Sequence, residues 1–218
     1  MRSILIALSL IAGLAGCAVK PANDSPAEVI TAAAYRDPSA PSLTLLTVVS
    51  NRSGSGAHSA LVVNGSQRVI FDPAGSYKHP RVPENGDVLY GITPAVLQSY
   101  KGAHARSTYH VVSQTVPVTA EQAERVLQLV RGYGNVGDAR CAQATTDILT
   151  QVPGFQGIKS TWFPANLMDQ FGTLPGVVTD KYYENDEGDI VDGVAKSSFD
   201  LIGRCRAPRT FDAMHRVF

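Results

Sequence analysis

Three side chains that are far apart in the sequence, Cys141, His58 and Asp72, are of the types needed for nucleophilic catalysis by a thiol. Cys141 follows the glycine-rich segment 132–137 and Asp138, which can cap a helix, and is predicted to lie in the first turn of that helix. Free N–H groups and the helix dipole stabilise an anion at this end, so they lower the pKa of a thiol. A thiolate, a histidine base and a third group that orients the histidine form the site of a cysteine hydrolase.

His58 and Asp72 are predicted to lie on two strands of one hairpin, because the segment 64–66 (NGS) is a strong turn signal. If these three residues form the loop, residue 58 lies directly opposite residue 72, with Cβ atoms about 5 Å apart on the same face. A two-residue turn would shift the register by one and remove this opposition. We predict that Asp72 lies about 2.6–3.2 Å from one ring nitrogen of His58, and the Cys141 sulfur within about 4 Å of the other.

Other residues offer alternatives to this site. His110 lies in the middle of a predicted strand and is the second candidate for the base. Cys141 and Cys205 form an even pair in a chain that we expect to be exported, so they could instead form a disulfide. The remaining histidines, at positions 79, 104 and 215, have no metal-ligand spacing, and we predict neither a metal nor a cofactor.

The N-terminus has the pattern of an export signal, with Arg2, an apolar run over 4–14 and small residues before Cys17. The segment 14–17 (LAGC) resembles the lipobox of bacterial lipoproteins, which implies that Cys17 becomes the first mature residue, carrying diacylglycerol and palmitate. We therefore divide the chain into a signal peptide (1–16), a lipidated tether (17–41) and one domain (42–218). A short helix over 27–35 could make part of that tether a packed arm instead.

Charge and composition narrow the classes of partner. The full chain carries 19 basic and 19 acidic side chains, and loss of Arg2 with the signal leaves a mature net charge near −1. A near-neutral protein offers no electrostatic attraction for nucleic acid. The lipid anchor predicts a membrane-attached protein of the cell envelope, on the periplasmic side of the outer membrane in a host with two membranes.

The predicted elements indicate an α+β fold in which a small antiparallel sheet packs against helices. Strands are predicted over 43–49, 58–63, 68–71, 87–92 and 108–116. Helices are predicted from Thr93-Pro94, over 119–132 with a Thr119/Gln122 capping box, over 141–151, and from Pro164. No element is predicted beyond residue 177.

The order of the candidate residues resembles a known family. A histidine opens a strand in 57–63 (AHSALVV), and a cysteine follows at a helix start in 138–145 (DARCAQAT). This order is similar to the circularly permuted branch of the NlpC-like papain-fold superfamily, over about residues 42–172. Two positions differ: Arg140 stands where many members have asparagine, and Asp72-Pro73 stands where the acyltransferase-like members commonly have a second histidine.

The resemblance implies a permuted papain-like arrangement and a thiol hydrolase that cleaves an amide bond, in a cell-wall (peptidoglycan) peptide or a related substrate. Cys141 would be the nucleophile, His58 the base and Asp72 the orienting group. Two alternatives remain at this point. One is a non-catalytic envelope lipoprotein of the same fold with a Cys141–Cys205 disulfide, and the other is a lipid acyltransferase.

Overall fold

The computed structural model describes residues 24–75 and 77–203, and within them the fold is α+β, as expected. Seven antiparallel strands form one sheet in the order β4-β5-β3-β2-β1-β6-β7. The strands are β1 (Ser42–Ser50), β2 (Gly56–Asn64), β3 (Arg68–Phe71), β4 (Glu84–Asn85), β5 (Val88–Leu89), β6 (Tyr109–Pro117) and β7 (Val178–Tyr183). The described helices are α2 (Ala27–Ala33), α3 (Pro94–His104), α4 (Ala120–Tyr133), α5 (Cys141–Leu149), α6 (Pro164–Gly172) and α7 (Ile190–Gly203).

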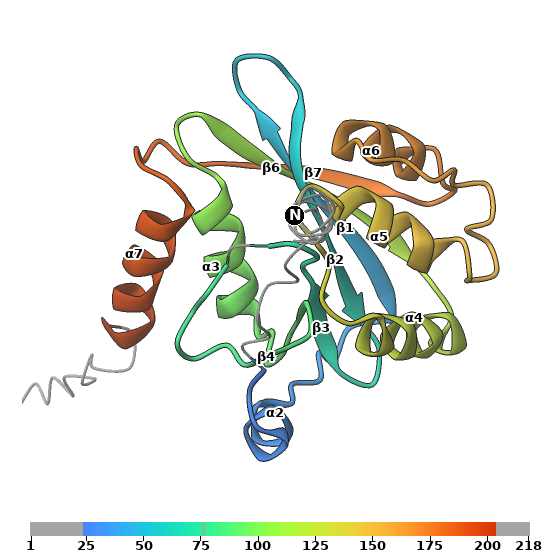
Figure 1. The fold of residues 1–218 in the computed structure, drawn as a ribbon, viewed down its shortest axis with the longest axis horizontal. Coiled ribbons are helices and arrows are strands. Elements are labelled where there is room, and N and C mark those ends of the chain that lie inside the picture. The colour runs from blue at the N-terminus through green and yellow to red at the C-terminus, as the bar shows by residue number, and fades with distance from the viewer. Residues whose placement is uncertain (1–23, 76, 204–218) are drawn as a thin grey trace, which may run out of the picture.

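The central strands are apolar on both faces, because helices cover the sheet on both sides. The side chains on the two faces of β1 belong to two different buried clusters. Leu43 and Leu45 belong to the first cluster, and Leu46 and Val48 belong to the second. Helices α4, α5 and α6 supply the first cluster, whereas α3 and the start of α7 supply the second. Figure 1 shows these two groups of helices on opposite sides of the sheet.

Two of the helix starts follow the predicted capping chemistry. The hydroxyl of Thr93 accepts a hydrogen bond from Val96 at the start of α3, and Thr119 and Gln122 form the predicted capping box of α4. Helix α5 differs from the prediction, because Arg140 occupies its N-cap position and no side chain caps it. The first turn of α5 is therefore left without a side-chain acceptor for its N–H groups.

The region after residue 177 contains two elements that the sequence analysis did not predict. Strand β7 pairs with β6 along its whole length, from His110↔Tyr183 to Thr115↔Val178, and makes the sheet larger than expected. Helix α7 packs so closely on α3 that a Cβ at Gly193 would lie 2.6 Å from the Cα of Ala103. Strand β7 thus enlarges the sheet beyond β6, and α7 covers α3.

Residues 24–41, the described part of the predicted tether, pack on the domain. The N–H of Ser25 donates to the carbonyl of Glu84, and Tyr35 accepts from the N–H of Arg68. The guanidinium of Arg68 also forms a 2.6 Å ion pair with Asp37. Residues 24–41 thus form a packed arm, which the sequence left open for residues 27–35 as the alternative to a tether.

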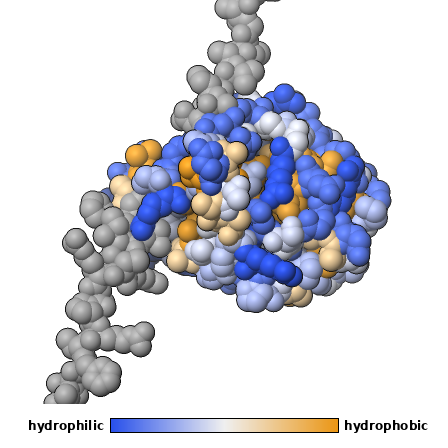
Figure 2. Space-filling view, turned by 90° about the horizontal axis from the view of Figure 1, so that it is seen from below, coloured by the Kyte–Doolittle hydropathy of each residue, from blue (hydrophilic) through white to orange (hydrophobic). Residues whose placement is uncertain are grey.

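The surface carries no large apolar area in the view of Figure 2, where hydrophilic residues predominate and apolar ones are scattered among them. No helix among the described residues has the length and hydrophobicity needed to cross a bilayer. The predicted signal peptide, Cys17 and Cys205 lie outside the described residues.

Candidate active site

His58 and Asp72 meet on the sheet, although by a different register from the predicted one. The hairpin loop comprises Gly65 to Gln67, and Asn64 pairs with Arg68. Each residue of β2 therefore pairs with a residue two positions later in β3 than the predicted register gives. Continued one step past the last pair, Leu61↔Phe71, this register places Asp72 opposite residue 60 rather than residue 58. A shift of two keeps both side chains on one face of the sheet. The diagonal neighbours still connect, because His58 Nε2 lies 2.6 Å from Asp72 Oδ1.

Asp72 is buried and held by groups from three elements. The hydroxyl of Tyr100 on α3 donates to Asp72 Oδ1 over 2.7 Å, so this oxygen receives hydrogen bonds from both Tyr100 and His58. The chain turns sharply beside the other oxygen, and a Cβ at Gly75 would lie 1.9 Å from Asp72 Oδ2. Only glycine leaves room for the carboxylate at this position, so the turn after β3 fixes the side chain.

Cys141 reaches the site from the other side of the sheet. It is the first residue of α5, which packs on the first buried cluster through Ala144, Ile148 and Leu149. The first hydrogen bond of this helix runs from Ala144 N–H to Arg140 C=O, so the three preceding N–H groups have no acceptor within the helix. The thiol is buried and forms no disulfide within the described residues, which do not include Cys205.

The electrostatic environment links the three side chains. Burial alone would lower the pKa of His58, but the charge and hydrogen bond of Asp72, with a smaller contribution from Cys141, raise it to about 10. Burial would raise the pKa of the Cys141 thiol, but hydrogen bonding with His58 and its charge lower it below the ordinary value. Burial would likewise raise the pKa of Asp72, and His58 outweighs this and lowers it. The favoured state is therefore a thiolate and an imidazolium beside a carboxylate.

Ser59, which follows His58, also favours the thiolate. Its backbone N–H and its hydroxyl both lower the pKa of Cys141. The hydroxyl oxygen is buried and has no other hydrogen-bond partner among the described residues, so it is a polar group free to act beside the thiol. Two neighbouring residues of β2 therefore lower the pKa of the Cys141 thiol. His58 acts through its charge and hydrogen bond, and Ser59 acts as a neutral hydrogen-bond donor.

His104, the last residue of α3, lies beside this group. Its ring stacks on that of His58 with 5.8 Å between centroids. Burial is the largest cause that lowers the pKa of His104, to about 4, so the ring is neutral at neutral pH. Its Nδ1 lies 2.8 Å from the carbonyl oxygen of Tyr100, which can only accept, so Nδ1 carries the proton and Nε2 is left as an acceptor.

The ligand atoms of His58, Asp72 and His104 lie within 4.8 Å of one another, which makes them the one group among the described residues that could hold a metal ion. The observed geometry fits a hydrogen bond better than a metal site. Two ligands of a tetrahedral zinc ion lie about 3.3 Å apart, whereas His58 Nε2 and Asp72 Oδ1 are separated by 2.6 Å.

Not all predicted site residues come together. His110, the second candidate for the base, bonds to Asn51 through Nδ1 and stacks on Tyr183, and no interaction connects it to Cys141. Tyr100 and His104 were not predicted as site residues. Their spacing of four residues on a helix places them on one face, but no local signal relates that face to Asp72.

The arrangement can perform nucleophilic attack on a carbonyl carbon. It supplies a thiol whose pKa is lowered, an adjacent proton donor held in one orientation, and N–H groups of the first turn of α5 that can stabilise an oxyanion. Comparisons with family models, curated proteins and solved structures found no match to this chain.

Proposed function

We propose that the protein is a thiol hydrolase that cleaves an amide bond. Cys141 is the nucleophile, His58 transfers the proton and Asp72 orients His58. The observation that carries the proposal is the charge coupling of the three side chains, in which Asp72 raises the pKa of His58 to about 10 and His58 lowers that of Cys141. Structural cysteines rarely have such an environment, because a buried thiol without a charged partner has a raised pKa.

The reaction follows from the geometry in two steps. The sulfur attacks the amide carbon, and the developing oxyanion is stabilised by N–H groups at the start of α5. Because Nε2 of His58 is engaged by Asp72, Nδ1 is the nitrogen that donates a proton to the leaving amine. Neutral His58 then removes a proton from water, which attacks the thioester, and the thiolate leaves beside a restored imidazolium.

The substrate class follows from the sequence. A lipid-anchored envelope protein meets peptide amides of the cell wall in its own compartment, so a peptidoglycan peptide or a related amide is the substrate that we propose. The order of the histidine, the carboxylate and the cysteine along the chain is that of the permuted NlpC-like group, which supports the same chemistry. Near-neutral charge fits a small substrate better than a polyanion.

The decisive experiment is alkylation of the native protein with iodoacetamide without reductant, followed by peptide mass spectrometry. We expect Cys141 to be labelled at pH 6, and Cys205→Ser to leave that labelling unchanged, whereas Cys141→Ser should abolish it. A Cys141–Cys205 disulfide in the untreated protein would refute the hydrolase and support the non-catalytic alternative.

Substrate assays separate the two enzymatic readings. Incubation with purified peptidoglycan should release new amino termini, and Cys141→Ser should release none. If acyl groups are instead transferred from phospholipid vesicles while peptidoglycan is untouched, the protein is a lipid acyltransferase and the amide proposal fails.

A further inference from the structure

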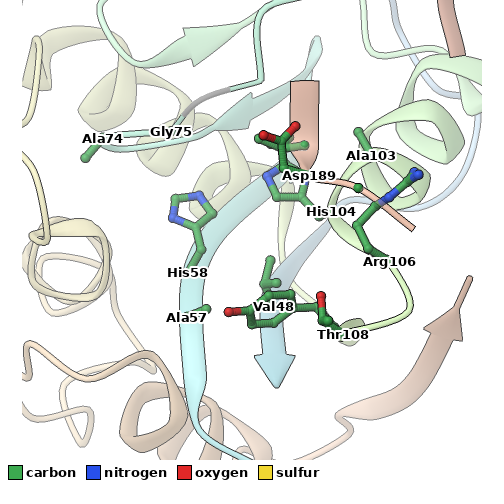
Figure 3. Close-up of a pocket in the computed structure, with 13 residues that line it drawn as sticks. Val48, Ala57, His58, Ala74, Gly75, Ala103, His104, Arg106, Thr108 and Asp189 are labelled. Carbon is green, nitrogen blue, oxygen red and sulfur yellow. The ribbon is translucent and has the colours of Figure 1, made fainter. Parts of the chain in front are cut away.

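A pocket of about 460 Å³ opens beside His58, on the side of the sheet covered by α3 and α7. Its volume lies in the usual range for sites that bind small molecules. Strands β1 and β2 supply one wall, the end of α3 supplies another, and the residues that begin α7 close it. Figure 3 shows the rings of His58 and His104 at this pocket, with Val48 and Thr108 on its lower side.

The position of the pocket relative to the site identifies which part of a substrate it can receive. His58 lines the pocket, whereas Cys141, which comes from the opposite side of the sheet, does not. In an acyl transfer the carbonyl carbon must sit at the sulfur, and the leaving atom must lie within reach of the proton donor. A substrate placed with its carbonyl at Cys141 therefore directs its leaving group past His58 and into this pocket.

The lining indicates the chemistry of that group. Val48, Tyr109 and Ile190 present apolar surface. Among the side chains next to His58, His104 is buried and neutral, and its Nε2 accepts no hydrogen bond from the described residues. Apolar walls beside a neutral histidine acceptor fit an amine that has an apolar side chain and a further N–H group, which His104 Nε2 can accept.

We infer that this pocket binds the leaving half of the substrate, and that this half is an amino acid or short peptide with a large apolar side chain next to the scissile nitrogen. The inference rests on the proposed function and adds the class of leaving group to it. The charged residues Arg106 and Asp189 also line the pocket and offer charged partners to polar groups of that half.

The test uses the reverse of the first step, which needs no natural substrate. p-Nitrophenyl acetate acetylates the thiol and releases nitrophenolate, and an added amine can then capture the acetyl group in competition with water. The amine nitrogen bonds to the thioester carbon, the carbon–sulfur bond breaks, and the amine proton passes to His58. By microscopic reversibility the capturing amine occupies the leaving-group site.

The probes are L-phenylalaninamide and glycinamide, which share the reacting group and differ in the apolar side chain. We expect L-phenylalaninamide to capture the acetyl group at least about tenfold more efficiently than glycinamide, as measured from the two N-acetyl products by mass spectrometry. Equal capture of the two amines would overturn the inference, while leaving the thiol hydrolase intact. Absence of a nitrophenolate burst that depends on Cys141 would instead count against the proposed function.

Two variants locate the effect. Thr108 is exposed at the rim of the pocket, so Thr108→Phe should fill the space and lower the capture ratio towards one. Ser107→Phe is the matched control, because Ser107 is equally exposed and does not line the pocket. Direct acetylation of each amine by the ester is measured with Cys141→Ser and subtracted, and urea unfolding shows whether each variant is folded. Ala57→Leu repeats the test from β2, and an unchanged ratio in both pocket variants would place the leaving group elsewhere.

Discussion

Replacement of Asp72 by asparagine tests the charge coupling at the centre of the site. The carboxylate lies 2.6 Å from His58 Nε2, and two unit charges centred about 4 Å apart interact by about 4 kcal/mol at an effective dielectric constant of 20. That energy corresponds to about three pKa units. Together with the hydrogen bond from Asp72 and the smaller contribution of Cys141, it outweighs burial and raises the pKa of His58 from 6.5 to about 10. Asparagine keeps the size and can still accept hydrogen bonds from His58 and Tyr100. It removes only the charge, so burial should then hold the pKa of His58 below its ordinary value.

Loss of the Asp72 charge should change the ionisation of the Cys141 thiol, because protonated His58 lowers the pKa of that thiol. In the wild-type protein the imidazolium persists up to about pH 10, so thiolate forms below the ordinary thiol pKa of 9.0. The rate of alkylation by iodoacetamide should therefore reach its plateau below pH 9.0 and stay near it until His58 loses its proton. In Asp72→Asn the thiol should titrate at 9.0 or above, which leaves about 1% thiolate at pH 7 and slows alkylation by up to about 100-fold. The difference should vanish as the pH approaches 10.

Asp147→Asn is the matched control. Asp147 lies on the same helix as Cys141 and accepts a hydrogen bond from Tyr133, without contacting His58, so its loss should leave the alkylation profile in place. Urea unfolding of both variants shows whether each is folded at the pH of the assay. If Asp72→Asn alkylates at the wild-type rate at pH 7, Asp72 does not set the protonation state of His58 and the proposed coupling is wrong.

Three further predictions concern the surroundings of the site. Tyr100→Phe removes a 2.7 Å hydrogen bond to Asp72 and should lower the free energy of unfolding by about 1.5–3 kcal/mol in urea titrations; no change would mean that the bond contributes nothing. Gly75→Ala should displace the Asp72 carboxylate and slow Cys141 alkylation at pH 7, whereas Gly132→Ala, which has open space around it, should not. Cys17→Ser should abolish lipid labelling and membrane association, and a variant that kept both would refute the lipoprotein assignment.

Much of the fold could be predicted because its determinants are local. Helix α4 begins at a capping box and buries Ala123, Val126, Leu127 and Val130 on one side, as its apolar spacing indicates. The continuous apolar run over 43–49 predicts β1, which is the pattern of a strand buried on both faces, whereas alternation over 108–116 predicts β6. Strand β7 was missed because it lies at the edge of the sheet and its side chains are mostly exposed. Its position depends on pairing with β6, which no local pattern expresses.

The candidate site was predictable to a different degree for each residue. The pairing of His58 with Asp72 tolerated an error of two in the hairpin register, because an even shift preserves the face and long side chains bridge the diagonal. A shift by an odd number of residues would have placed the two side chains on opposite faces of the sheet. The prediction therefore required only that the register be wrong by an even number of residues. The approach of Cys141 had no comparable local basis, since it comes from the helix layer on the other side of the sheet. The packing of α5 against the first buried cluster brings Cys141 to His58. The charge of Asp72 keeps His58 protonated, and the protonated His58 in turn lowers the pKa of the Cys141 thiol.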